Sequence, residues 1–402
     1  MSRWTGEVLR QMRERGDNEA DEALVQAMAH QDIPAINRLF GSFSAENKGI
    51  PANAPQSFLD FVARTGAPPP GLDIARATRG GEVMLEHATL CSLALLLYSL
   101  PYGYAAPRLA NILDLTQNLE KRTYLRTLGV LQMLVNISAP GAFDPDGAAL
   151  PTAQKLRLLH AGVRHVVRGK LPGYQAQFGT PLSQLDLVFT LMTFSVLVID
   201  GVERLGAKWT QQQAADYFYL WQMYGHLAGI EPEFMPRSVE EGRDFCRAYA
   251  GEFAEAENNA AGVRLTKADL KMLRRLMPTW LKCLGFRPAP KIYLIRMVGK
   301  EGALRVGVKG NPGSVLLQWI VLEFPAFLQR FLRSLPLERG LHTWLSRVFF
   351  TGLIDSGRGG EVKFSVPTSL QELRRLDLSD PPRPLPKAAE AMAAEQGEPA
   401  AR

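Results

Sequence analysis

The sequence predicts an all-α protein, built as one large helical domain with an N-terminal extension and a C-terminal tail. Apolar residues recur at helical spacing over most of the 402 residues, and no segment of useful length alternates apolar and polar residues. No strand–helix–strand rhythm is present either, and only 291–299 (KIYLIRMVG) reads as either a strand or the start of a helix. The expected units are an extension at 1–80, a main domain at 81–376 and a disordered tail at 377–402.

The extension predicts short helices joined by turns. Two amphipathic helices are expected at 4–16 and 19–30, separated by Gly16-Asp17, where Asp17 is suited to cap the second helix. A helical turn at 33–40 and a short helix within QSFLDFVARTG follow, in a stretch rich in Gly, Pro, Ser and Asn. We expect this extension to wrap onto the main domain.

The main domain predicts long apolar helices. The most apolar run, at 90–100, has eleven residues, too few to cross a bilayer as a helix, and a second run at 187–199 is closely flanked by Asp residues, so both predict buried helices. The expected helices are 82–99, 105–115, 119–137, 154–170, 184–205, 210–229, 239–257, 265–284, 314–334 and 337–352, with loops at 138–152 and 171–183. The tail is rich in Pro, Ala and Glu and has few large apolar groups, a composition typical of disorder.

Composition is that of a globular protein, with 46% hydrophobic and 21% charged residues. The formal charge of +6 is mild and we find no dense Lys/Arg block, so nucleic-acid binding is not expected. The three cysteines are far apart and form no CxxC, zinc or CxxCH motif, which favours a reducing compartment and makes any haem non-covalent. The charged N-terminal stretch has no apolar run of a secretory signal, so we expect a soluble, cytoplasmic protein without a transmembrane segment.

One stretch, 154–170 (QKLRLLHAGVRHVVRGK), carries an unusual polar stripe. Arg157, His160, Arg164 and Arg168 are spaced by three, four and four residues and therefore share one face of the expected helix. One interpretation is a solvated basic face with a hydrogen-bonded histidine. The other is a metal ligand flanked by cations that neutralise an anionic cofactor, a description that haem fits because its iron accepts a histidine nitrogen and its propionates need positive partners.

Other catalytic signatures are absent from the sequence. There is no GxGxxG after a strand, no GxxxxGK[ST], no GxSxG and no HExxH. His165 lies five residues after His160, so the two rings point in different directions on a helix and cannot share a metal. His226 is the remaining candidate for a second axial ligand.

Several segments together resemble the latex clearing protein and MpaB-type oxygenase family, the rubber-oxygenase catalytic domain. The main one is KLRLLHAGVRHVV at 155–167, which is similar to the family signature of Arg, two residues, His, Ala, one residue, Val and Arg. Further similar segments, in order, are SLPYGYAAPRLANIL, LEKRTYLRTLGVL, DLVFTLMTFS and YLWQMYGHLAGIEPEFMP. The resemblance covers roughly residues 15–300.

The resemblance implies a globin-like helical core that holds haem b non-covalently. It assigns His160 as the proximal iron ligand and places Arg126 and Thr127 in the distal pocket, where the family has a Lys-Thr pair. It also implies that Arg164, with Arg157 or Arg122, offsets the charge of the propionates.

The resemblance also implies oxidative cleavage of carbon–carbon double bonds by dioxygen. The rubber-cleaving members use an upstream glutamate as a proposed base, whereas this chain has no Glu between Glu86 and Glu120 and only Asp114 as an acid there. We therefore expect a smaller apolar substrate, of isoprenoid or lipid type. The alternatives are a non-catalytic haem carrier or sensor, and a helical protein without a cofactor.

Overall fold

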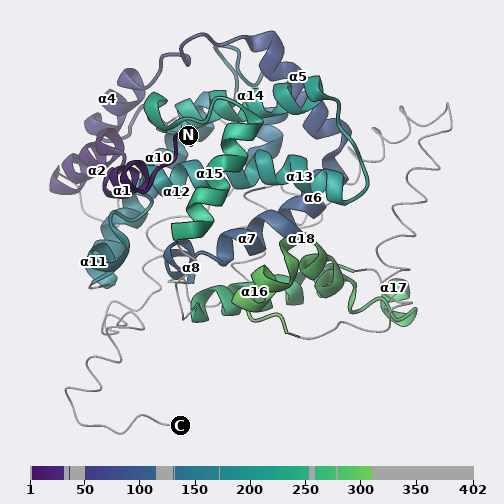
Figure 1. Cartoon of the computed structure of the whole chain (residues 1–402). Coiled ribbons are helices and arrows are strands. Elements are labelled where there is room, and N and C mark those ends of the chain that lie inside the picture. The colour runs from purple at the N-terminus through teal and green to yellow at the C-terminus, as the bar shows by residue number, and fades with distance from the viewer. Residues whose placement is uncertain are drawn as a thin grey trace, which may run out of the picture.

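The computed structural model of the chain describes residues 2–30, 36, 50–114, 130, 132–171, 173–252, 259–277 and 279–309. All regular elements in these ranges are helical, which confirms the all-α prediction (Figure 1). The elements of the first half are α1 (Gly6–Glu14), α2 (Asn18–His30), α4 (Gln56–Arg64), α5 (Ile74–Glu86), α6 (Ala88–Ala94), the π-helix η1 (Leu95–Ser99), α7 (Leu100–Tyr104) and α8 (Pro107–Asp114). Those of the second half are α10 (Ala149–Lys170), α11 (Tyr174–Phe178), α12 (Gln184–Phe194), α13 (Val196–Arg204), α14 (Gln211–Leu227), the 3-10 helix η2 (Pro232–Phe234), α15 (Val239–Glu252), α16 (Ala260–Leu276), α17 (Thr279–Cys283) and α18 (Ala289–Arg305).

Two long helices predicted from apolar runs are broken in the structure. The run expected at 82–99 begins at Ile74 and bends by 82° at His87, and it continues as η1 before Pro101. A proline supplies no backbone N–H, so the carbonyl four residues before it loses its α-helical donor, and a wide π turn is one local adjustment. The run expected at 184–205 is divided at Ser195, whose hydroxyl donates to the carbonyl of Leu191 at 2.8 Å.

Other boundaries also differ from the expectation. The helix expected at 265–284 begins at Ala260 and ends at Leu276, and α17 follows as a separate helix. Residues 291–299 lie in α18, so the strand alternative is wrong. Helix α10 begins at Ala149, inside the expected loop 138–152, because Pro151 falls in the first turn, where the missing N–H costs no hydrogen bond. The expected loop 171–183 contains α11. The helices expected at 314–334 and 337–352, the turn at 33–40 and the tail from 377 lie outside the described residues, as does most of the helix expected at 119–137.

Helix α12 runs through the main hydrophobic core. All but one of its eleven residues are buried, and α1, α7, α13, α14 and α15 pack around it. Helix α5 crosses α14 at very short range, because Gly80 leaves no room for a side chain: a Cβ there would lie 2.3 Å from the carbonyl oxygen of Asp216. The stretch Gln184–Arg204 is long and apolar enough to span a membrane. However, 89% of its most apolar 18 residues are buried inside the protein, as expected for a core helix.

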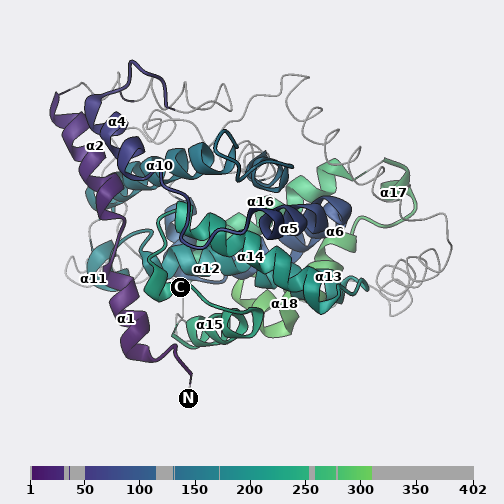
Figure 2. The same cartoon turned by 90° about the horizontal axis from the view of Figure 1, so that it is seen from above.

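Residues 3–30, with helices α1 and α2, form an N-terminal arm that lies along one side of this core. Figure 2 shows α2 beside α4 and α10, and α1 beside the end of α12. Trp4 packs its ring edge-on against Phe245, and Met12 and Leu9 are buried in the main core. The expected wrapping of the extension onto the main domain is therefore present for this segment.

Candidate functional site

Helix α10 carries the histidine that the sequence singles out. It contacts α2, α11 and α14, and its apolar side chains are divided among three clusters. Ala149 and Ala153 belong to the main core. Leu158 and Ala161 pack with Phe58 and Phe61 of α4, whereas Val167 packs with Ile112 of α8. The helix that carries His160 is therefore held by apolar contacts on several sides.

The imidazole of His160 is neutral at physiological pH. Its pKa is lowered to about 4, mainly because the ring is removed from water and secondly because Arg164 is positively charged. The residue nevertheless keeps part of its surface accessible. A neutral imidazole with accessible surface has a nitrogen lone pair free to bind a metal, which protonation would block.

Arg157, one turn before His160, is buried and faces the N-terminal arm. Its Nε and Nη2 donate to the two carboxylate oxygens of Asp17 at 2.7 and 2.8 Å, and Nη2 also lies 2.6 Å from Glu19. The guanidinium also lies 5.1 Å from the centre of the Phe61 ring. These carboxylates raise the pKa of Arg157 against the effect of burial and keep it charged.

Arg164, one turn after His160, is fully buried and is paired in the same way. Its Nε donates to Asp21 at 2.6 Å and its Nη1 to the carbonyl of Leu182 at 3.3 Å. Arg168 approaches the same Asp21 at 3.7 Å and is exposed. The Nη2 of Arg164 is buried and has no hydrogen-bond partner in the part of the chain that the structure describes.

The basic stripe is thus mostly an internal seam between α10 and the arm. Neither interpretation of the sequence foresaw this, because Arg157 and Arg164 are not solvated, and carboxylates of the chain itself already balance most of their charge. Among the buried donors of this stripe that the structure describes, the Nη2 of Arg164 is the one without a partner and could meet a further anion. The other expected site residues, Arg122, Arg126 and Thr127, lie outside the described residues.

His226, the candidate second ligand of the sequence, lies on α14, a helix that packs against α10. His226 lies near the end of α14, partly exposed, and burial lowers its pKa. His165 is exposed, on another side of α10. In the described ranges, no group of three or more His, Cys, Asp or Glu side chains is arranged to hold a metal ion. A haem iron needs only one or two protein ligands, so this finding bears on other metals.

Sequence reasoning missed a buried charge network next to the site. Arg108 of α8 and Asp186 of α12 are both fully buried, and their side chains meet at 2.5 and 2.8 Å. The guanidinium also donates to Ser183 Oγ and to the carbonyls of Phe178 and Thr180. Asp186 completes a capping box with Ser183 at the start of α12. The Ser-x-x-Asp spacing signals that cap, but its arginine partner is 78 residues away.

A loop contact joins this network to the arm. The side-chain amide of Gln184 donates to the carbonyl oxygens of Gly16 and Gly229 at 3.3 and 2.9 Å, and its oxygen accepts from the N–H of Glu231. The starts of α2 and α12 and the end of α14 therefore meet beside Arg157.

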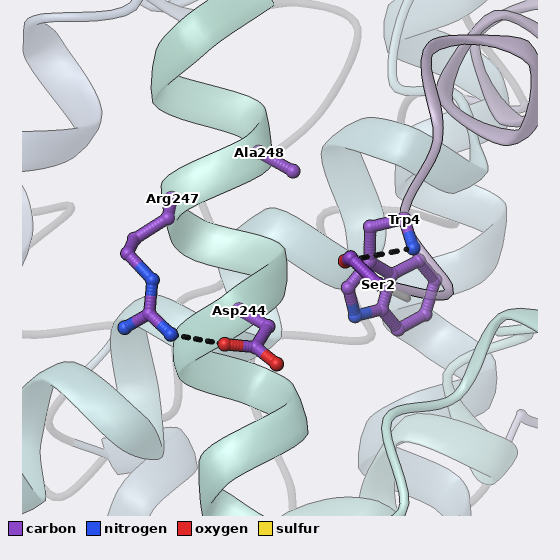
Figure 3. A pocket seen from close by; sticks show the side chains of 5 residues that line it. All are labelled: Ser2, Trp4, Asp244, Arg247 and Ala248. Atoms are coloured by element: carbon purple, nitrogen blue, oxygen red, sulfur yellow. Dashed lines mark hydrogen bonds and ion pairs between the residues drawn. The ribbon is translucent and has the colours of Figure 1, made fainter.

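A separate pocket of about 550 Å³ lies between the first residues and α15 (Figure 3). It is lined by Ser2, Trp4, Asp244, Arg247 and Ala248. Asp244 and Arg247 form an ion pair with each other, so the pocket presents no unpaired charge and no imidazole. We do not assign chemistry to it.

Comparisons with known proteins identify the family of the chain. Residues 90–313 match the family "ER-bound oxygenase mpaB/B'/Rubber oxygenase, catalytic domain". The rubber oxygenase of Streptomyces sp. (strain K30) is 25% identical over 232 residues, which are 55% of this chain and 54% of that protein. The chain thus matches about half the length of this curated relative.

The structure of a latex clearing protein in its closed state shares the fold. The TM-score is 0.68 at 21% sequence identity, and the match covers 85% of this chain and 90% of the other. Together with the match over residues 90–313, this means that the chain belongs to the family of MpaB-type and rubber oxygenase catalytic domains.

Proposed function

We propose that the protein is a haem b-dependent oxygenase that acts on an apolar substrate of isoprenoid or lipid type, by oxidative cleavage of a C=C bond or related dioxygen chemistry. The observation that carries the proposal is His160, a neutral and partly accessible imidazole at the family's signature position. Membership of an oxygenase family supports the reaction class.

The residues present fit a haem group. His160 supplies one nitrogen ligand, and the buried, unpaired Nη2 of Arg164 is a donor suited to a propionate oxygen. When bound, haem would supply the dioxygen chemistry, while the protein sets access, polarity and orientation. Arg157 has a different role in this proposal: it holds α10 against Asp17 and Glu19, so that the His160 backbone stays in place. Arg126 and Thr127 remain the proposed distal residues, on the family resemblance alone.

A non-catalytic haem carrier or sensor is the second candidate, and one contact favours it. The only carboxylate between Glu86 and Glu120 is Asp114, and Asp114 is bound to Arg264 of α16, with two contacts at 3.1 and 3.2 Å. Both oxygens of this carboxylate accept hydrogen bonds from the guanidinium, so the contact directs them to Arg264 and not to a substrate. Turnover separates the two candidates.

The test is an absorption spectrum of the purified protein, expressed with added haem precursor, beside His160→Ala and the control His226→Ala. We expect a Soret band in the wild type and in His226→Ala, and its loss in a folded His160→Ala. A folded wild-type protein without a Soret band would reject the haem proposal, and a band that survives in His160→Ala would move the ligand elsewhere. Incubation with squalene or a polyisoprene emulsion under oxygen then tests catalysis: carbonyl products indicate an oxygenase, and their absence supports the carrier.

A further inference from the structure

The positive charge of the chain is concentrated in one segment. Residues 264–309 contain twelve Lys or Arg against two Asp or Glu, a net charge of +10. Because the whole chain carries +6, the remainder carries −4. The mild overall charge therefore conceals a local excess: the sequence has no short Lys/Arg block, but its cations accumulate over these 46 residues.

This segment folds into an outer layer, which we call the basic layer and define as α16, α17, residues 284–288 and α18. Figure 1 shows α16 below α7 and α8, α18 beside α7, and α17 farther to the right. Its inner side is apolar, since Leu265, Leu294 and Val306 form a buried cluster with Tyr104 and Ala110. The charged side chains consequently face away from the core.

On α16 the cations form a continuous stripe. Arg264, Lys267, Lys271 and Arg274 are spaced by three, four and three residues, and all four are exposed. Arg264 is paired with Asp114, whereas Asp269 of the same helix is buried and lies off this exposed stripe.

Several cations of the layer have no counter-charge in the described part of the chain. Six exposed side chains have no ion pair within the described part of the chain: Lys267, Arg274, Arg287, Arg296, Lys300 and Arg305. The exposed acid of the layer is Glu301. Such a surface attracts polyanions over about one Debye length, roughly 10 Å at 0.1 M salt.

Exposed apolar side chains distinguish among the possible polyanions. Leu284 and Leu304 are 66% and 56% exposed and Val263 is 36% exposed, all within the layer. A phosphate backbone gains nothing from such side chains, whereas a lipid surface buries them beside its head groups. A pocket of about 240 Å³, lined by Tyr102, Phe189 and Val298 among others, also borders the layer at Glu301 and Arg305.

We propose that the basic layer docks the protein on an anionic membrane surface, with Leu284 and Leu304 entering the head-group region. The attraction is electrostatic and the apolar side chains add hydrophobic burial. This goes beyond the proposed reaction and does not depend on haem. It also gives an apolar substrate a place from which to enter the protein.

The test is sedimentation of the full chain with vesicles, in about 0.1 M salt. One set is pure phosphatidylcholine, and the other contains about 30% phosphatidylserine. The variant Arg274→Gln/Arg296→Gln/Lys300→Gln neutralises the layer. Its matched control is Arg10→Gln/Arg64→Gln/Lys208→Gln, three exposed cations outside the layer. Leu284→Ser is compared with Val25→Ser, whose side chain is 60% exposed on α2.

We expect the wild type to prefer the anionic vesicles. The layer variant should bind them about a hundredfold more weakly, since each Lys or Arg near an anionic surface contributes about fivefold, and the control triple variant should bind nearly as the wild type does. Leu284→Ser should weaken binding, and Val25→Ser should not. Equal binding to both vesicle types, equal effects of the two triple variants, or tighter binding to duplex DNA at the same salt would overturn the proposal. If the layer variant loses its helical circular dichroism spectrum, the comparison of Leu284→Ser with Val25→Ser tests the proposal instead.

Discussion

Asp17 and Arg157 form a two-pronged ion pair between residues 140 positions apart in the sequence, and both side chains are nearly buried. The pair fixes the start of α2 to the helix that carries His160. Asp17 also accepts from the N–H of Ala20 and so caps α2. A single carboxylate therefore orders the arm and holds α10.

Removing this carboxylate tests its contribution to stability. Asp17→Asn keeps the cap but leaves the buried Arg157 with Glu19 alone, so we expect the free energy of unfolding to fall by about 3 kcal/mol, the scale found when a buried pair loses one partner. The control is Glu19→Gln, because the Glu19 side chain is 51% exposed, and its loss should cost less than about 1 kcal/mol. Urea unfolding followed by circular dichroism measures both, and similar losses in the two variants would contradict this role of Asp17.

His160 makes the haem-free protein sensitive to acid. Its pKa is about 4 in the folded protein and 6.5 in the unfolded chain, so the unfolded state binds the extra proton first as the pH falls. Stability is therefore full above pH 6.5 and is lost as the pH falls toward 4, by up to about 3 kcal/mol.

The variant His160→Gln should unfold with a shallower pH dependence between pH 4 and 6.5 than the wild type. His165→Gln is the control, because that side chain is exposed, and it should retain the wild-type pH profile. The measurement is the urea concentration at the midpoint of unfolding, determined for the three proteins at several pH values in this range. Parallel profiles for wild type and His160→Gln would show that the imidazole is not shielded in the folded state.

The buried Arg108–Asp186 pair predicts a large loss of stability when its carboxylate is replaced by an amide. Asp186→Asn removes the charge that balances a fully buried guanidinium, and we expect the free energy of unfolding to fall by about 3–5 kcal/mol. Asp200→Asn is the comparison, since its partner Arg243 is 34% exposed, and about 1 kcal/mol or less is expected there. Thermal melting curves suffice. Equal shifts in the two variants would show that water reaches Arg108.

The α5–α14 crossing makes Gly80 irreplaceable. An alanine Cβ would lie 2.3 Å from the Asp216 carbonyl oxygen, a backbone atom that moves only if the helices separate. We expect Gly80→Ala to destabilise the protein by at least about 2 kcal/mol, although alanine is the better helix former.

Gly169 provides the matched control in the last turn of α10. A Cβ there meets nothing within 4 Å, so Gly169→Ala should stabilise the protein by about 0.5–1 kcal/mol. The two substitutions should thus shift the melting temperature in opposite directions. A neutral Gly80→Ala would mean that α5 and α14 are not packed this closely.

The sequence predicts α10 and its polar stripe well, because periodicity is a local property. It does not predict that Arg157 meets Asp17, since nothing local specifies a contact across 140 residues. The breaks at His87 and Ser195 were missed for a related reason: both positions lie inside or next to apolar runs without Gly or Pro at the break. The apolar pattern of residues 291–299 is compatible with a strand and with a helix. In the folded chain they form part of helix α18, which packs against α16.

In the candidate site, too, local features are predicted from the sequence and long-range contacts are not. His160 follows from the spacing of one segment and the family signature, and the structure adds its lowered pKa. The partners of Arg157 and Arg164 come from the arm, and Arg108 and Asp186 come from two helices that the sequence separates by 78 residues. Such buried pairs need the tertiary fold before either residue can be recognised as a partner. Arg126 and Thr127 stay predictions.

The arm also has a consequence for the order in which the protein is made. The backbone carbonyls of Glu14 and Arg15 accept hydrogen bonds from Thr180 and Gln184, and the Arg15 side chain binds Glu231. At about 5–20 residues per second, a ribosome needs on the order of 10 s or more to reach these partners after the arm has emerged. During that interval the apolar side of α1 has nothing to pack against. Closure of the arm is therefore a late event of synthesis, and a chaperone that binds nascent chains has time to meet this segment first.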